Sequence, residues 1–283
     1  MSSSLSEVRR KPRRRVPLAG LVGAFIVVFW LVMAVAGPWL AAHDSGGVAS
    51  DAVFAPMSAQ YPLGTDYLGR DMLSRILNGA PYTIGVALAA VLVASVGGTT
   101  LAMFAAAAGG WFDAVVSRVV DTMLSIPHKL LALIIVAAFG SSVPFLILTA
   151  GIGYMPGAFR IARALAVNVQ AMDYVQAARA RGEGLLYITC REMLPNMLRP
   201  VLADFGLRFL FIVLLLSGLS FLGLGVQPPM ADWGSLVREN LGALPMGGAS
   251  VLAPALAIAV LTIAVNMVID NLPGHTDADR ETH

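Results

Sequence analysis

Long uncharged stretches alternate with short polar segments along this chain, and the pattern predicts a membrane protein. No charged residue occurs within 16–42, 81–112, 130–159, 209–231 or 240–269. A helix needs about 20 predominantly apolar residues to cross the hydrocarbon core of a bilayer. Each stretch is therefore long enough for at least one span, and we predict an all-α integral membrane protein with six transmembrane helices.

The count of six depends on where these stretches are interrupted. Residues 140–144 bring glycine, two serines and proline together in the middle of one stretch, a composition typical of a turn. We therefore predict two antiparallel spans there, roughly 118–139 and 144–162. The sixth span is expected to begin near Ala249.

A basic segment, residues 1–15, precedes the first apolar stretch and carries six arginine and lysine residues. A cleaved signal peptide also begins with basic residues, but its apolar core spans about 7–15 residues. The uncharged run over 16–42 is longer than that. We therefore interpret it as a retained first transmembrane helix.

The distribution of basic residues predicts the orientation. In this six-span arrangement, sixteen of the nineteen arginine and lysine residues lie on one side of the membrane and three, Arg70, Arg75 and Arg238, lie on the other. Cytoplasmic loops carry the excess of basic residues in membrane proteins. Both chain ends are therefore predicted to be cytosolic.

The composition argues against several classes of function. Charged residues make up 13% of the chain, against about 25% in soluble domains. The single cysteine excludes an internal disulfide, and the scattered histidines have no metal-binding spacing. Neither lysine follows a phosphate-binding glycine loop. We expect no catalytic residues, no metal and no cofactor, so any energy from ATP must come from another chain. The span centres also lack the ionisable residues typical of ion-coupled carriers, which argues against a secondary transporter.

The second half of the chain contains a polar segment between apolar stretches. Its pattern predicts a helix over 164–181, a glycine turn at Gly182, and a second short helix over 185–194. Pro195 and Pro200 are expected to interrupt the chain beyond this second helix. A cytosolic helix–turn–helix between two membrane spans is the result.

This segment resembles the "EAA" loop of ABC importer permeases, in which a coupling helix sits in a groove of the ATPase subunit. Gln176 stands where that loop usually has Glu, and Glu192 where it has Ile. Glutamine can form hydrogen bonds but no ion pair. The resemblance therefore does not imply an ion pair between position 176 and the ATPase subunit. The residues to which the resemblance assigns coupling are Gln176, Ala177, Ala178, Gly182, Glu183, Leu185, Tyr187, Leu194 and Pro195.

Three further motifs resemble the C-type permease of the oligopeptide, dipeptide and nickel importer family. They are the run from Tyr61 to Arg75, the segment ending Leu-Ser-Ile-Pro at 127, and the run from Leu219 to Gly234. Proline at position 81 and serine at 217 depart from the family pattern. The residues that carry the resemblance are Gly64, Asp66, Gly69, Arg70, Asp71, Ser74, Arg75, Asp121, Pro127, Ser220, Gly223, Gly225 and Trp233.

Two pairs of opposite charges allow two interpretations each. Arg118 and Asp121 lie three residues apart on one helix face, and can form a local ion pair or help to move a gate. Asp204 and Arg208 lie four residues apart, and can form a helix-end pair or contact a substrate.

The resemblance covers roughly 60–235 and implies one of two membrane subunits of an ABC importer in the bacterial cytoplasmic membrane. It implies a second similar permease subunit, two ATP-binding subunits, an extracytoplasmic substrate-binding protein and a surrounding bilayer, with no nucleic acid. The resemblance implies short peptides as the first substrate class, and nickel chelates, haem or another small solute as the alternative. The segments then are a basic N-terminus (1–15), a first span (16–42), an extracytoplasmic segment with a short amphipathic helix (43–80), the permease core (81–272, with the coupling loop at 164–200) and a cytosolic tail (273–283).

Overall fold

The computed structural model describes residues 18–246 and 248–271, and the regular elements of this part of the chain are helices. Five helices are long and apolar enough to cross a membrane, and a bent pair, counted as one span, makes six. The predicted all-α membrane fold is confirmed. The helices are α1 (Leu18–Leu40), α2 (Met72–Ala80), α3 (Val86–Ala108), α4 (Gly110–Leu124), α5 (His128–Phe139), α6 (Val143–Gln170), α7 (Asp173–Ala180), α8 (Leu185–Tyr187), α9 (Leu194–Phe221), α10 (Trp233–Glu239) and α11 (Ala249–Asp270).

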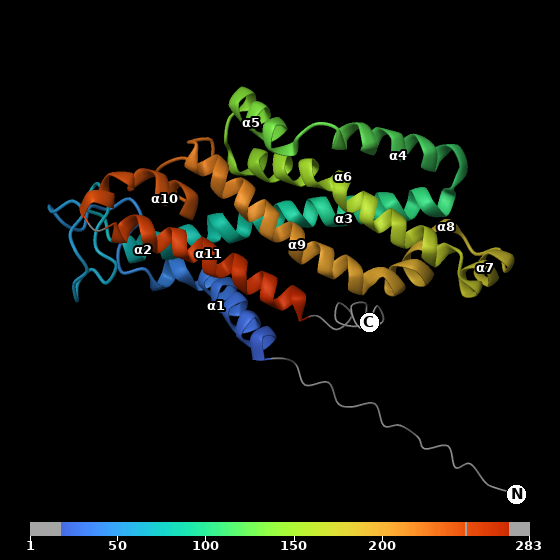
Figure 1. Ribbon diagram of the computed structural model, residues 1–283, viewed down its shortest axis with the longest axis horizontal. Coiled ribbons are helices and arrows are strands. Elements are labelled where there is room, and N and C mark those ends of the chain that lie inside the picture. The colour runs from blue at the N-terminus through green and yellow to red at the C-terminus, as the bar shows by residue number, and fades with distance from the viewer. Residues whose placement is uncertain (1–17, 247, 272–283) are drawn as a thin grey trace, which may run out of the picture.

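The molecule is elongated, with a loop-rich end and a hairpin end (Figure 1). The loop over 41–71 and α10 lie at the first end, and α7 and α8 lie at the other. Two long helices connect the ends. The π-helical turn Pro81–Gly85 joins α2 to α3 in a continuous helix of 37 residues, and the π-helical segment Ile188–Met193 joins α8 to α9 in another helix of 37 residues.

These two continuous helices correct two predictions. The short amphipathic helix expected in 43–80 exists, but it runs directly into the second span instead of ending before Pro81.

Pro195 and Pro200 likewise do not interrupt the helix that contains them. Proline lacks the N–H of the regular helical bond. A π-type turn begins at Pro81 and another ends just before Leu194, and such turns accommodate an altered bonding pattern within a helix.

The third predicted span is also different in the structure. It begins at Gly110 rather than near 118, and it is divided into α4 and α5, which meet at an angle of 79°. Residues 125–127 form the bend, and Pro127 is the residue that precedes α5. Proline disfavours helical geometry at the residue before it, so a straight helix cannot pass through this point easily.

Close helix contacts at glycine hold the apolar helices together. A side-chain carbon added at Gly23 of α1 would lie 2.8 Å from the carbonyl oxygen of Ala264 in α11. One added at Gly98 of α3 would lie 2.8 Å from the carbonyl oxygen of Met155 in α6. Small residues allow the backbones of membrane helices to approach in this way.

Two buried apolar clusters lie along the long axis. The first joins α2, α3, α9, α10 and α11, and the second joins α3 and α6 to the hairpin end. Members of the first include Met72, Ile76, Ile212, Trp233 and Leu261, and members of the second include Met103, Phe159, Val175, Ile188 and Met193. The predicted termini, 1–15 and 273–283, lie outside the described residues.

Candidate functional site

Residues 173–193 form the hairpin, which consists of α7, a turn over 181–184, α8 and the π-helical segment that leads into α9. The uninterrupted helix predicted over 164–181 is wrong, because α6 ends at Gln170 and α7 begins at Asp173. The side-chain amide of Gln176 donates a hydrogen bond of 2.9 Å to the carbonyl oxygen of Gln170. This bond satisfies a carbonyl at the end of α6, where the helix itself supplies no donor.

The same bond gives the glutamine at position 176 a physical role. A carboxylate at this position accepts hydrogen bonds but cannot donate one. The contact with Gln170 therefore depends on the residue by which this chain departs from the family pattern. The expectation that a glutamine here forms no ion pair with an ATPase subunit stays a prediction.

The hairpin has a buried side and an exposed side. Val175 and Ala178 are fully buried against the second apolar cluster, whereas Gln176 and Ala177 between them are exposed. Leu186 exposes 68% of its surface. One side of the hairpin thus anchors it to the membrane helices, and the other remains available for contact with another protein.

The turn of the hairpin ends α7 in a defined way. Gly182 has φ +83°, its N–H donates to the carbonyl of Arg179, and the N–H of Glu183 donates to the carbonyl of Ala178. This is the Schellman arrangement, in which a residue in the left-handed conformation ends a helix. The prediction of a helix end at this glycine is confirmed.

The remaining predicted hairpin residues have different surroundings. Glu183 lies 3.8 Å from Arg181 in an exposed ion pair, and the guanidinium of Arg191 lies 5.9 Å from the ring centre of Tyr187. The last two residues that the motif singled out, Leu194 and Pro195, form the start of α9.

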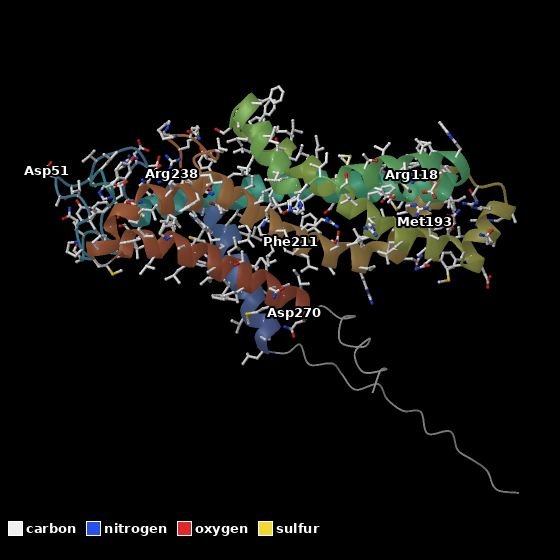
Figure 2. All side chains as sticks on the ribbon, turned by 45° about the horizontal axis from the view of Figure 1, so that its top comes forward. Asp51, Arg118, Met193, Phe211, Arg238 and Asp270 are labelled. Carbon is white, nitrogen blue, oxygen red and sulfur yellow. The ribbon has the colours of Figure 1, made fainter. Side chains whose placement is uncertain are left out.

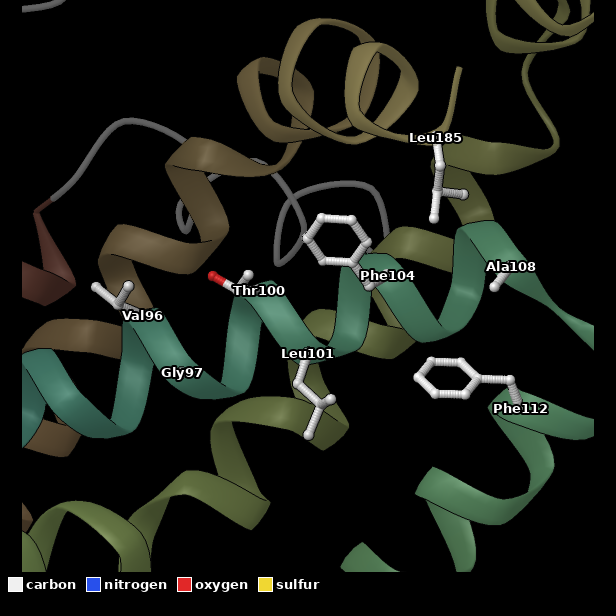
Figure 3. Close-up of a pocket in the computed structure, with 8 residues that line it drawn as sticks. All are labelled: Val96, Gly97, Thr100, Leu101, Phe104, Ala108, Phe112 and Leu185. Atoms are coloured by element: carbon white, nitrogen blue, oxygen red, sulfur yellow. The ribbon is translucent and has the colours of Figure 1, made fainter. Parts of the chain in front are cut away.

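Leu185 belongs to an apolar groove beside the hairpin. The groove has a volume of about 720 Å³ and lies between α3, the start of α4 and α8. Leu185 reaches toward it from α8, above Phe104 of α3 (Figure 3). This leucine therefore contacts the groove beside the membrane helices, although 40% of its surface is exposed.

One residue of the hairpin was not singled out in the sequence. The guanidinium of Arg179 donates a hydrogen bond of 2.9 Å from Nη2 to the carbonyl oxygen of Ala107, near the end of α3. A basic residue in the last turn of a helix is common. Nothing in the sequence indicates that this one reaches a segment 72 residues away.

The opposite end of the molecule contains an ionic cluster, which we define as Asp66, Arg70, Arg75 and Glu239. In Figure 2, the labels Asp51 and Arg238 mark this end of the molecule, and Met193 marks the hairpin end. Arg75 Nη1 lies 2.7 Å from Asp66 Oδ2 and 2.8 Å from Glu239 Oε2. Asp66 is completely buried, and its other oxygen accepts hydrogen bonds from the N–H groups of Leu68 and Arg70.

Other members of the Tyr61–Arg75 motif build the start of α2. Asp71 precedes the helix and accepts hydrogen bonds from the N–H and the hydroxyl of Ser74. This is the usual way in which aspartate caps a helix. Gly64 and Gly69 both have positive φ, as turns require. The motif thus forms a compact loop with a capped helix.

Trp233 joins this region to α10. Its side chain is fully buried, and its indole N–H donates a hydrogen bond of 3.0 Å to the carbonyl of Ile76 in α2. Nearby, a side-chain carbon added at Gly225 would lie 1.7 Å from the hydroxyl of Ser220, so this contact requires glycine. Gly223 has φ +85° at the end of α9. The Leu219–Gly234 motif therefore forms the close return of the chain from α9 to α10.

Asp232 caps α10 within this return. Its carboxylate accepts a hydrogen bond from the N–H of Ser235, and its own N–H donates to the hydroxyl of Ser235. Burial raises the pKa of Asp232, while hydrogen bonds from Ser220 and Ser235 oppose that shift. The folded protein consequently binds a proton at this carboxyl more strongly than the unfolded chain does.

We expect this shift to make the protein less stable as the pH rises from about 4, the ordinary pKa of aspartate, through the raised pKa of Asp232, because the folded state then buries a charge. Asp232→Asn keeps an acceptor oxygen but carries no charge, and should remove that decline. Asp232→Ala should lose the cap, which costs about 1 kcal/mol, and should likewise lack the decline with pH. Thermal unfolding of the purified protein in detergent between pH 4 and 8 tests this. Parallel curves for the wild type and Asp232→Asn would contradict it.

The two predicted charge pairs have different outcomes. Asp204 and Arg208 form an ion pair at 2.6 Å, but it lies inside α9 rather than at a helix end. Arg208 also donates to the carbonyl of Tyr154 in α6. Among the described residues, Arg118 forms no ion pair with Asp121. Instead, Arg163 Nε of α6 donates to Asp113 at the start of α4 at 2.6 Å. The charges on α4 thus connect it to α6 rather than to each other.

No group of three or more histidine, cysteine, aspartate or glutamate side chains could hold a metal ion in the part of the chain that the structure describes. The polar chemistry found there consists of helix caps, ion pairs and side-chain bonds to backbone carbonyls. Such an arrangement positions helices relative to one another.

Comparison with known proteins gives a consistent assignment. Residues 98–278 match the family described as "Binding-protein-dependent transport system inner membrane component". A putative peptide transport system permease protein of Brucella suis biovar 1 is 35% identical over 267 residues, 93% of this chain and 88% of that protein. A probable D,D-dipeptide transport system permease protein of Escherichia coli K12 is 36% identical over 220 residues, 78% of this chain and 74% of that protein.

A di/tripeptide transport system permease protein of Pseudomonas aeruginosa is 32% identical over 261 residues, which cover 90% of this chain and 85% of that protein. The family match spans more than half of the chain, and it includes the hairpin and α9. The apolar helices agree with a protein that crosses the membrane several times. This chain therefore belongs to the family of binding-protein-dependent transport system inner membrane components, the membrane permease subunits of ABC transporters.

Proposed function

We propose that this chain is a permease subunit of an ATP-driven importer that moves short peptides across the bacterial cytoplasmic membrane. The hairpin supports this proposal most directly. It presents an exposed side beyond the ends of α3 and α6, while its buried side is fixed to them. A surface of this kind suits a partner that pushes on the hairpin and thereby displaces the membrane helices.

The names of the relatives support peptides as the substrate class. The Brucella suis, Escherichia coli and Pseudomonas aeruginosa proteins are described as peptide, D,D-dipeptide and di/tripeptide permeases. We propose the same class of substrate here. The alternative within the same family is a nickel chelate, haem or another small solute.

The proposed assembly contains a second, similar permease subunit and two ATP-binding subunits beneath the hairpins. A substrate-binding protein would deliver the peptide on the opposite side, where the ionic cluster and α10 lie. In this mechanism, closure of the ATP-binding subunits displaces the hairpins, and the membrane helices alternate between outward and inward access.

Co-expression of the tagged chain with the products of neighbouring genes tests the proposal. We expect a second permease and an ATPase to co-purify with it. In proteoliposomes, a binding protein loaded with a di- or tripeptide should stimulate ATP hydrolysis and peptide uptake, whereas the same protein loaded with a nickel chelate should not. Purification of the chain without an ATPase, or uptake driven by a proton gradient alone, would favour a secondary transporter instead.

A further inference from the structure

The hydrogen bond from Arg179 joins the hairpin to the end of α3. Ala107 lies in the last turn of α3, where carbonyl groups lack a donor from the helix itself. Arg179 supplies one of the missing donors, and its positive charge also suits the negative end of the helix dipole. The bond joins the hairpin to a helix that is distant from it in the sequence.

The helix α3 is the second part of a long continuous helix that begins with α2. Met72–Ala108 is continuous over 37 residues, which corresponds to about 55 Å at 1.5 Å per residue. Its first turn contains Arg75, which binds both Asp66 and Glu239 in the ionic cluster. Arg179 therefore holds one end of the same helix whose other end belongs to the ionic cluster.

The hairpin also has two covalent connections, to α6 and to α9. The connection to α9 is a continuous helix, Leu185–Phe221. Two residues separate α6 from α7, and Gln176 binds the end of α6. Any displacement of the hairpin must therefore move α6. Displacement of α6 also reaches α3, because the two helices pack closely at Gly98. At this end the hairpin itself holds α3 through apolar contacts and the bond from Arg179.

We propose that Arg179 is a positioning residue that ties the hairpin to α3, so that displacement of the hairpin reaches the ionic cluster through the continuous helix Met72–Ala108. This inference rests on the proposed function, because it takes the ATP-binding subunits as the cause of the displacement. It assigns α3 and α6 to one unit that moves with the hairpin.

Arg181 provides a matched control. It lies two residues from Arg179 in the same hairpin, and within the described residues its ion pair is with Glu183, inside the turn. Its side chain is 55% exposed. Replacing either arginine with alanine removes the same charge, but only Arg179→Ala breaks a bond to another helix.

A distance measurement on the full chain tests the contact without requiring transport. Cys190 is the only cysteine of the chain and is exposed in the hairpin region. A spin label there can be paired with one at Val96→Cys, an exposed position on α3. We expect Arg179→Ala to broaden the distance distribution, Arg179→Lys to restore most of its width, and Arg181→Ala to leave it unchanged. An unchanged distribution in Arg179→Ala would overturn the inference.

The assembled transporter tests the consequence. We expect Arg179→Ala to co-purify with the ATPase as the wild type does, but to hydrolyse about tenfold more ATP per peptide transported, since a hydrogen bond to a charged group contributes roughly that factor. Arg179→Lys, which keeps the charge and a donor, should restore most of the coupling. Loss of ATPase binding in Arg179→Ala would overturn the inference, because Arg179 would then contact the ATPase. A wild-type complex without peptide-stimulated hydrolysis would refute the proposed function. The spin-label distances would still show whether Arg179 holds the hairpin against α3.

Discussion

Arg75→Met is expected to lower the free energy of unfolding by about 3–5 kcal/mol, the usual cost of removing one partner from a buried ion pair. Asp66 is completely buried and would keep the more distant guanidinium of Arg70, 3.4 Å away. Glu239 is largely buried and would lose the guanidinium that it binds. Methionine is similar in length but has no donor for either carboxylate. Unfolding of the purified protein in detergent, followed by heat or denaturant, measures the effect.

Arg238→Gln is the matched control for this variant. Arg238 precedes Glu239 in α10, but its side chain is exposed, so its replacement should change stability by less than about 0.5 kcal/mol. Combining Arg75→Met with Asp66→Asn should cost less than the sum of the two single variants, because the asparagine carries no charge that needs Arg75, whereas Glu239 still loses its partner. A loss below about 1 kcal/mol for Arg75→Met alone would show that the ionic cluster does not stabilise this end of the protein.

Gly182→Val is expected to reduce peptide transport at least tenfold while the subunits still assemble. Gly182 has φ +83°, a conformation that costs a β-branched residue about 1–3 kcal/mol. Apart from Gly182 itself and its two neighbours in the chain, no atom of the residues that the structure describes lies within 4 Å of the position that a side-chain carbon would occupy. The strain therefore comes from the backbone alone, and it should shift the exposed side of the hairpin relative to the membrane helices. Transport and ATP hydrolysis are measured in the same proteoliposomes.

Gly184→Val separates backbone strain from added bulk. Gly184 lies in the same turn and also has open space around it, but its φ is −74°, which valine adopts readily. We expect this variant to transport normally. Equal losses in both variants would mean that the turn tolerates no side chain at all. Normal transport by Gly182→Val would refute the role of the helix end at this glycine.

The prolines and the third span show where sequence patterns are weakest for this protein. A proline predicts the loss of one hydrogen bond, but not whether a π-type turn will accommodate it. The helices continue through Pro81 and Pro195, which lie at π-type turns, and through Pro200 inside α9, but the chain bends by 79° at Pro127. The outcome depends on the neighbouring helices, which a local pattern does not describe.

The sequence by itself determined the membrane-spanning helices and the helix end within the hairpin. The uncharged stretches are long enough to require membrane helices, and Gly182 is the residue that most easily takes the left-handed conformation at the end of α7. These features are local, because they depend on the length, composition and conformational freedom of one segment.

Only the tertiary structure decided which polar groups meet. Glu239 joins Arg75 across 164 residues, and Arg179 reaches Ala107 across 72. A side chain's partner depends on which helices pack together and how far the long side chains reach, and neither is encoded within one segment. The continuous helix from Met72 to Ala108, with an arginine contact at each end, emerged only when those segments were brought together in space.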